Sequence, residues 1–188
     1  MTDNLRGSLM MVLAMLGFAF EDSFLKLAAK LMPLGEVLAL MGLIGMALFS
    51  ALALRKGAAP LPRSILSRTM ALRSGSEVVG RVFYALALAL TPISQASAIL
   101  QATPLVVVGG AALLFGEKVS LLRWLLILAG FAGVLIIIRP GVEGFSALSL
   151  LAVAGLLGFA GRDLATRAAP PALSNAQLGV AGFLMLAL

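Results

Sequence analysis

The 188-residue sequence contains no cysteine and no histidine. It therefore has no disulfide, no thiolate nucleophile, no imidazole general base and none of the usual ligands for zinc or haem. Charge is also scarce, because Asp, Glu, Lys and Arg make up 12% of the residues, against about a quarter in soluble domains. These absences argue against an enzyme and against a metal or other cofactor.

What the sequence has in abundance is apolar surface. Hydrophobic residues make up 61% of the chain, and its mean hydropathy is +1.10. Its net charge of +6 comes from bases clustered in short links between apolar runs, as is typical of cytoplasmic loops rather than of a nucleic-acid surface. We therefore expect the lipid bilayer, and no nucleic acid, as a partner.

Seven hydrophobic segments result when the chain is divided where charges, proline and glycine cluster. A bilayer core about 30 Å thick requires roughly 20 apolar residues per helix, and the last segment is shorter than this. The fold class predicted is an all-α polytopic membrane protein. The segments are 8–29, 34–54, 72–90, 93–115, 121–138, 145–166 and 176–188.

The distribution of bases predicts the orientation. The link after the second segment is rich in Lys and Arg, whereas the link after the third is essentially Thr91-Pro92 and carries no charge. Because bases concentrate on the cytoplasmic side, the basic link and the N-terminus are predicted to be cytoplasmic, in a bacterial inner (plasma) membrane. The bases of that link are Arg55, Lys56, Arg63, Arg68 and Arg73.

An internal repeat connects the first and sixth segments. The tetrapeptide LGFA at 16–19 recurs at 157–160, and at the same offset Asp22 matches Asp163 and Lys26 matches Arg167. Five segments precede the second copy, so that copy enters the membrane from the opposite side, as in inverted-repeat transporters. This predicts a first repeat over 1–141 and the start of a second over 142–188. The alternative is chance similarity between two helices rich in Leu, Ala and Gly.

Several motifs also resemble a known family. They are ALALALTPIS at 85–94, Pro104, FGEKVS at 115–120 and GFAGVLIIIRPG at 130–141. Together they resemble the EamA-type family of the drug/metabolite transporter superfamily. The resemblance implies ten helices in two inverted five-helix repeats, and solutes such as amino acids, nucleosides, other metabolites or drugs. About seven helices are present here, so we expect a fragment or a truncated product.

The function predicted is secondary transport of a small-molecule solute by alternating access. The alternative is a structural helical subunit, or a transporter fragment, that does not transport. The sequence is compatible with a homodimer. It is also compatible with coupling to protons, since Glu77, Asp22 or Asp163 would be free to take up a proton if its basic partner moved away.

The third segment supplies the first candidate site. Glu77 and Arg81 stand four residues apart in the order that favours an intrahelical ion pair, and Tyr84 continues their face. Ionisable groups in a membrane helix are costly and usually face a cavity or a partner. Arg81, near mid-membrane, is predicted to attract an anionic group of the solute. The alternative is a neutralised pair that only docks the helix.

Two further charge pairs are predicted, Asp22 with Lys26 and Asp163 with Arg167. Their spacing is again acidic first and basic four later. Inversion places the first pair near the outer face and the second near the inner face, so we expect them to act as alternating gates. Alternatively, Lys26 and Arg167 only extend to the lipid headgroups.

The fourth segment carries a polar stripe at helical spacing, formed by Ser94, Ser97 and Gln101. Pro104 removes a backbone hydrogen bond and is predicted to bend this helix. The stripe and the bend together suggest a polar pathway for the solute. Ordinary hydrogen bonding between neighbouring helices is the alternative.

Overall fold

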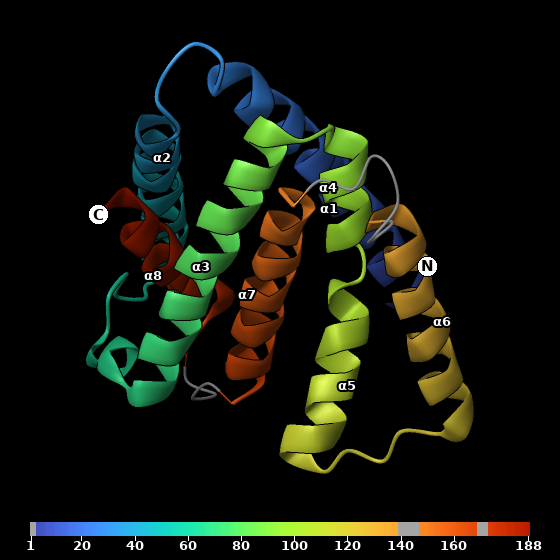
Figure 1. Ribbon diagram of the computed structural model, residues 1–188. Coiled ribbons are helices and arrows are strands. Elements are labelled where there is room, and N and C mark those ends of the chain that lie inside the picture. The colour runs from blue at the N-terminus through green and yellow to red at the C-terminus, as the bar shows by residue number, and fades with distance from the viewer. Residues whose placement is uncertain (1–2, 139–146, 169–172) are drawn as a thin grey trace.

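The computed structural model describes residues 3–138, 147–168 and 173–188, and in these ranges all regular secondary structure is helical (Figure 1). The predicted all-α fold is confirmed, and the fourth predicted segment consists of two helices. The boundary between the predicted repeats, at 141–142, lies outside the described residues. The helices are α1 (Asp3–Ala28), α2 (Leu34–Arg55), η1 (a 3₁₀ turn, Arg63–Leu66), α3 (Arg68–Leu90), α4 (Ile93–Leu100), α5 (Thr103–Phe115), α6 (Leu121–Ile138), α7 (Ser149–Arg167) and α8 (Asn175–Ala187).

Four stretches are long and apolar enough to cross a membrane, namely Leu5–Ala28, Leu34–Arg55, Ile93–Phe115 and Ser149–Arg167. α3 is long enough as well, with 23 residues, but it carries more charge. Large apolar side chains on the outside, such as Phe24, exposed to 67%, are what a lipid environment requires. The chain is a multi-pass membrane protein with one unusually polar helix.

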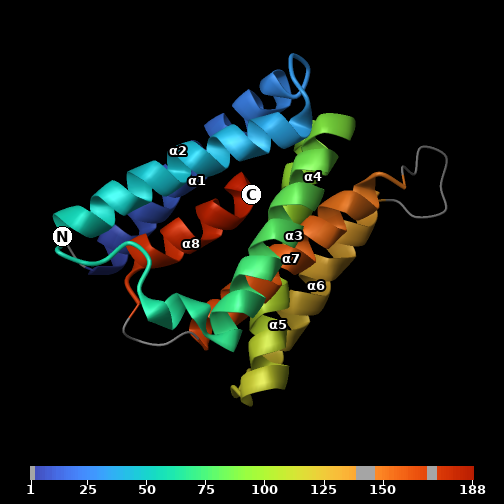
Figure 2. The same ribbon diagram turned by 90° about the vertical axis from the view of Figure 1, so that its left-hand side faces the viewer.

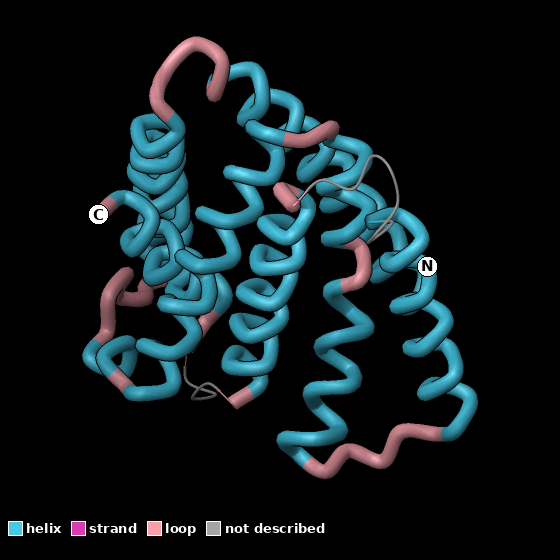
Figure 3. Tube along the Cα trace, viewed as in Figure 1, coloured by secondary structure: helices cyan, strands magenta, loops and turns pink. Residues whose placement is uncertain are grey.

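Successive long helices run in alternate directions (Figure 1). The turns after α2 and α5 lie at one end of the molecule, and those after α1 and α3 lie at the opposite end. α1, α2 and α8 lean together across the group formed by α3 to α7 (Figure 2). Figure 3 shows the described connections as loops between the helices, and α5 continues α4 in the same direction after a short break.

Helix ends follow from local sequence. The Ser67 side chain accepts a hydrogen bond from the backbone N–H of Met70 (3.3 Å) and caps α3. Ser174 and Gln177 form a capping box at the start of α8. α5 ends at Gly116, whose φ of +66° suits glycine. The Ser67 cap explains why α3 begins at Arg68, four residues before its predicted start at 72.

The predicted bend near Pro104 is confirmed as a break. α4 ends at Leu100 and α5 begins at Thr103, so Pro104 occupies the first turn of α5, where its missing N–H is tolerated. The Thr103 hydroxyl donates to the carbonyl oxygen of Leu100 (2.6 Å) and closes the gap.

The core lies between α3 and α7, which pack more extensively than any other pair, followed by α2 with α8. A Cβ atom added to Gly158 on α7 would collide with the backbone of Gly80 on α3. Small residues at this crossing allow the two backbones to touch. Buried apolar side chains such as Leu88 and Leu156 pack around the same interface.

Candidate functional site

Polar side chains follow one face of α3. Arg73, Glu77, Arg81 and Tyr84 are spaced by four, four and three residues and therefore share a side of the helix. The predicted ion pair forms, with 3.4 Å between Glu77 Oε1 and Arg81 Nε. Arg73 lies one turn earlier, with 3.7 Å between its Nη2 and Glu77 Oε2. The Glu77 and Arg73 side chains are each 9% exposed and that of Arg81 17%, so the most enclosed charges precede Arg81.

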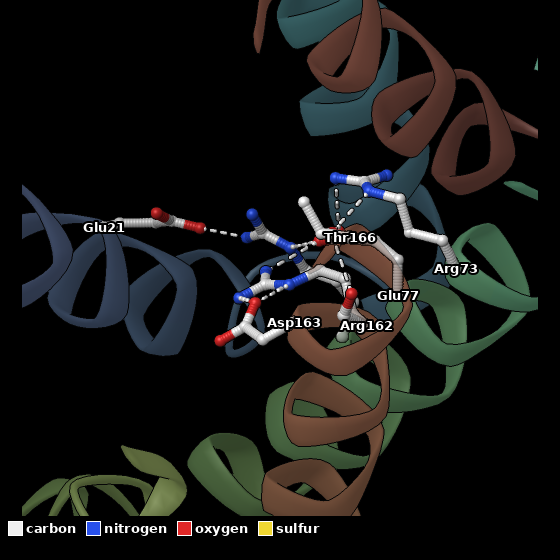
Figure 4. Close-up of polar contacts among 7 residues, drawn as sticks. Glu21, Arg73, Glu77, Arg162, Asp163 and Thr166 are labelled. Atoms are coloured by element: carbon white, nitrogen blue, oxygen red, sulfur yellow. Dashed lines mark hydrogen bonds and ion pairs between the residues drawn. The ribbon is translucent and has the colours of Figure 1, made fainter. Parts of the chain in front are cut away.

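α7 adds a third guanidinium group. Arg162 Nη1 lies 3.3 Å from Glu77 Oε1, while its Nη2 lies 2.8 Å from Asp163 Oδ1 (Figure 4). Its guanidinium carbon stands 4.9 Å from the ring centre of Phe159, within range of a cation–π contact. Glu77 is thus the shared ion-pair partner of three arginines from two helices. Such charge-assisted contacts account for the tolerance of buried charge here.

α1 completes this group, because the Glu21 carboxylate pairs with Arg81. We call the six side chains the charge cluster: Glu21, Arg73, Glu77, Arg81, Arg162 and Asp163. Three are acidic and three basic, so the cluster is neutral as a whole. It joins α1, α3 and α7 (Figure 4).

A second polar group lies one turn further along α3. The Tyr84 hydroxyl donates to Asp22 Oδ2 (2.7 Å), which also accepts from Ser97 (3.3 Å), and the two hydroxyl oxygens are 3.2 Å apart. This triad connects α1, α3 and α4. It brings together Asp22, Tyr84 and Ser97, three residues that the sequence analysis assigned to separate features.

The predicted pairing of Asp22 with Lys26 is not what the structure shows. Lys26 Nζ donates to the carbonyl oxygen of Leu88 (2.6 Å) and to that of Thr91 at the end of α3. The last carbonyls of a helix lack intrahelical partners and carry partial negative charge, so they compete well for an ammonium group. Asp22 takes hydroxyl donors instead. Lys26 therefore holds α1 against the end of α3.

The predicted pairing of Asp163 with Arg167 also differs. Asp163 pairs with the adjacent Arg162, and Arg167 Nη1 lies 2.7 Å from Glu117 Oε1 on the turn between α5 and α6. Arg167 lies in the last turn of α7, from which its side chain reaches the neighbouring turn. Both side chains of this second pair are about half exposed, at 44% and 51%.

The predicted stripe on the fourth segment does not form a continuous line. Ser97 belongs to the triad, whereas Ser94, Gln101 and Pro104 are exposed. The helical register holds through Gln101, whose N–H donates to the carbonyl oxygen of Ser97 (3.0 Å), and the break between α4 and α5 separates only Pro104 from it. Gln95 turns to α7 instead, donating to the Ser149 hydroxyl (2.8 Å).

Three members of the charge cluster escaped the sequence analysis as site residues. Arg73 was assigned to the basic link, yet α3 begins at Arg68 and includes it. Its position four residues before Glu77 was the available signal. Glu21 and Arg162 lie beside the predicted gate residues, but nothing in the spacing indicates that they cross to α3.

A pocket of about 160 Å³ lies beside the charge cluster, where α3, α7 and α8 meet. Arg81 closes one side, with its guanidinium carbon 5.5 Å from the ring centre of Phe183. Among the described residues, no group of acidic side chains is arranged to hold a metal ion. The lining residues are Arg73, Glu77, Arg81, Arg162, Leu178, Gly179, Gly182, Phe183 and Leu186.

The curated proteins that match this chain carry the names of transporters or exporters. The riboflavin transporters of Rhizobium johnstonii and Vibrio cholerae are 38% and 37% identical over 80 and 94 residues, which are 43% and 50% of this chain. The pseudopaline exporter CntI of Pseudomonas aeruginosa is 29% identical over 151 residues, or 80% of this chain. These alignments span 26%, 32% and 52% of the respective relatives, so the chain matches about half of their length at most.

No solved structure matches this chain. Residues 5–139, well over half of the sequence, match the EamA-like transporter family. The match covers α1 to α6 and so includes most of the charge cluster, the triad and the Lys26 contact. The chain belongs to the EamA-like transporter family.

Proposed function

We propose that this chain works as a secondary transporter of a small organic solute, using the charge cluster and its pocket as part of the pathway. The observation that carries the proposal is the set of three arginines around Glu77, beside a cavity in the middle of α3. Charged side chains within a membrane cost about 2.5–3.5 kcal/mol each on insertion scales and mark solute or ion pathways. The names of the relatives support transport as the activity class.

The proposed pathway is lined by Arg81, Glu77 and Tyr84 from α3 and by Ser97 from α4. The triad of Asp22, Tyr84 and Ser97 extends the polar face beyond the charge cluster. Coupling to protons through the carboxylates and assembly as a homodimer stay predictions.

Alternating access requires a closure at each end of the pathway. At one end, Lys26 ties α1 to the last carbonyls of α3. At the other, Arg167 ties α7 to Glu117 on the turn after α5. We propose that these two contacts open in turn. Lys26 and Arg167 then keep the gating role predicted from the sequence, but their partners differ from the predicted ones.

The inverted-repeat organisation belongs to the same proposal. The family match ends at residue 139, close to the predicted end of the first repeat at 141. The basic link after α2 and the alternation of helix direction support a cytoplasmic N-terminus.

Uptake into proteoliposomes tests the proposal. The purified 188-residue chain is reconstituted, and saturable uptake and counterflow are measured for radiolabelled amino acids, nucleosides, riboflavin and cationic drugs. We expect one class to show saturable flux that Arg81→Ala abolishes and Arg81→Lys reduces. Arg123→Ala on exposed α6 surface is the matched control and should leave the flux intact.

Size-exclusion profiles and thermal midpoints of every variant establish that the proteins are folded. A folded chain that moves no solute would contradict the proposal and favour a structural subunit. Loss of flux in the Arg123→Ala control as well would remove the special role of Arg81.

A further inference from the structure

The link from the end of α2 to the start of α3, residues 55–68, carries bases and no acidic residue. The nearest acidic residues along the chain are Glu36 before it and Glu77 after it. All the bases of the link are exposed, and none of them pairs with a carboxylate of residues 3–138, 147–168 or 173–188. Their positive charge is therefore available to an anionic partner. The four bases are Arg55, Lys56, Arg63 and Arg68.

Large apolar side chains stand exposed on the same link. Leu66 is 86% exposed and Leu61 51%, although this stretch is a loop and a 3₁₀ turn rather than a membrane-spanning helix. Segments that lie in the interface of a bilayer combine these features, because their apolar side chains enter the acyl region while their bases meet the headgroups. A soluble anion would offer nothing to Leu66, whereas a lipid offers both phosphate and hydrocarbon.

The link is also held in place from the side of the protein. The Gln177 side chain of α8, 6% exposed, donates from Nε2 to the carbonyl oxygen of Ala59 (2.8 Å). Ile65 packs against a small buried cluster that includes Met70 of α3 and Leu178 of α8. The link is thus fixed to the starts of two helices while its bases remain exposed. A surface that is already ordered loses little conformational entropy when it binds a partner.

We propose that this link binds the headgroup of an anionic phospholipid. Its bases contact the phosphate group, and Leu66 and Leu61 lie against the upper part of the acyl chains. A base near an anionic lipid surface strengthens binding by about fivefold, and salt screens the effect. Phosphatidylglycerol fits this chemistry, whereas the quaternary ammonium of phosphatidylcholine cancels the charge of its phosphate. The site is separate from the charge cluster and does not depend on whether the chain transports a solute.

Fluorescence quenching in nanodiscs tests the assignment directly. Because the chain contains no cysteine, Leu66→Cys provides a single thiol for a fluorophore. Small, equal amounts of nitroxide-labelled phosphatidylglycerol or phosphatidylcholine serve as quenchers in a phosphatidylcholine bilayer. We expect the labelled phosphatidylglycerol to associate about fivefold more strongly or better at low salt, and to lose this preference as salt is raised.

A second position provides the control for the quenching. Leu31, in the turn after α1, is exposed to 88%, much as Leu66 is to 86%, but it lies at the opposite end of the molecule with one base, Lys30, beside it. A fluorophore on Leu31→Cys should report the two labelled lipids within about twofold of each other.

Two double variants, each combined with Leu66→Cys, test the role of the bases. Arg63→Gln with Arg68→Gln should reduce the preference for phosphatidylglycerol to about twofold or less. Lys118→Gln with Arg123→Gln removes the same charge at the same end of the molecule, from the turn after α5 and the start of α6, and should keep the preference. All four side chains are exposed, so both variants should keep their thermal midpoint in uncharged lipid.

The assignment is overturned if both labelled lipids quench Leu66→Cys equally, or if Arg63→Gln with Arg68→Gln keeps the preference. It is also overturned if Lys118→Gln with Arg123→Gln abolishes the preference as completely, since general surface charge would then explain it. Excess glycerol 3-phosphate at matched ionic strength separates a lipid from a soluble phosphate. Continued quenching supports the lipid site, whereas displacement of the labelled phosphatidylglycerol would reject it.

Discussion

Glu77 on α3 and Arg162 on α7 meet with 3.3 Å between Oε1 and Nη1, at the centre of the most extensive helix contact in the protein. The same carboxylate serves Arg73 and Arg81. Its removal would leave three enclosed guanidinium groups short of one negative charge. The stability of the α3–α7 pair should therefore depend on this single acidic residue.

Glu77→Gln should lower the free energy of unfolding by about 3–5 kcal/mol, the usual consequence of breaking a buried ion pair from one side. The thermal midpoint in detergent measures the effect. Glu117→Gln makes the same substitution in the half-exposed pair with Arg167 and should cost about 1 kcal/mol or less. Equal losses in both variants would contradict the central role of Glu77.

Gly158→Ala should destabilise the protein by about 1–3 kcal/mol, because the added Cβ meets the backbone of Gly80 and forces the helices apart. Gly17 occupies the matching position of the LGFA repeat, where a Cβ would meet nothing within 4 Å. Gly17→Ala should be neutral or slightly stabilising. Unfolding in detergent compares the two, and equal behaviour would count against the close backbone contact.

The triad should behave as a coupled unit. Tyr84→Phe and Asp22→Asn each remove part of the same hydrogen-bonded group. Their combined effect on the unfolding free energy should depart from additivity by about 0.5–3 kcal/mol. Ser94→Ala on the exposed side of α4 supplies the control cycle with Asp22→Asn, which should be additive within about 0.5 kcal/mol.

Lys26→Met should loosen the end of α3. Since the chain contains no cysteine, Thr91→Cys provides a single thiol at this enclosed position. Thiol labelling should accelerate about two- to thirtyfold once the ammonium no longer holds the carbonyls. Lys30→Met, on the exposed turn after α1, should leave the labelling rate unchanged.

Orientation is open to a similar test. Single cysteines are placed at Leu31, in the turn after α1, and at Ser64, in the link after α2, both of them exposed. In whole cells, a membrane-impermeant thiol reagent should label Leu31→Cys and spare Ser64→Cys until the cells are opened. The reverse pattern would place the N-terminus outside.

Hydrophobic length and bases in the links were enough to predict the helical segments, and Pro104 was enough to predict a bend in the fourth segment, which the structure shows as a break between α4 and α5. Of the three charge pairs predicted from spacing, Glu77 with Arg81 forms and the other two do not. Lys26 finds the carbonyls of Leu88 and Thr91, which no side-chain pattern reveals. Arg73 was misplaced because a basic residue near a helix start resembles a loop residue. Contacts between helices depend on packing that one-dimensional spacing does not contain.

The touching backbones of Gly80 and Gly158 restrict how this protein moves. A slide of α3 along α7 by one residue, about 1.5 Å, would bring side-chain atoms toward a crossing that has room only for glycine. The two helices must therefore travel together as one rigid body during any transport cycle. The relative motion then falls to the sparser contacts that α1 makes with α3 and that α5 makes with α7.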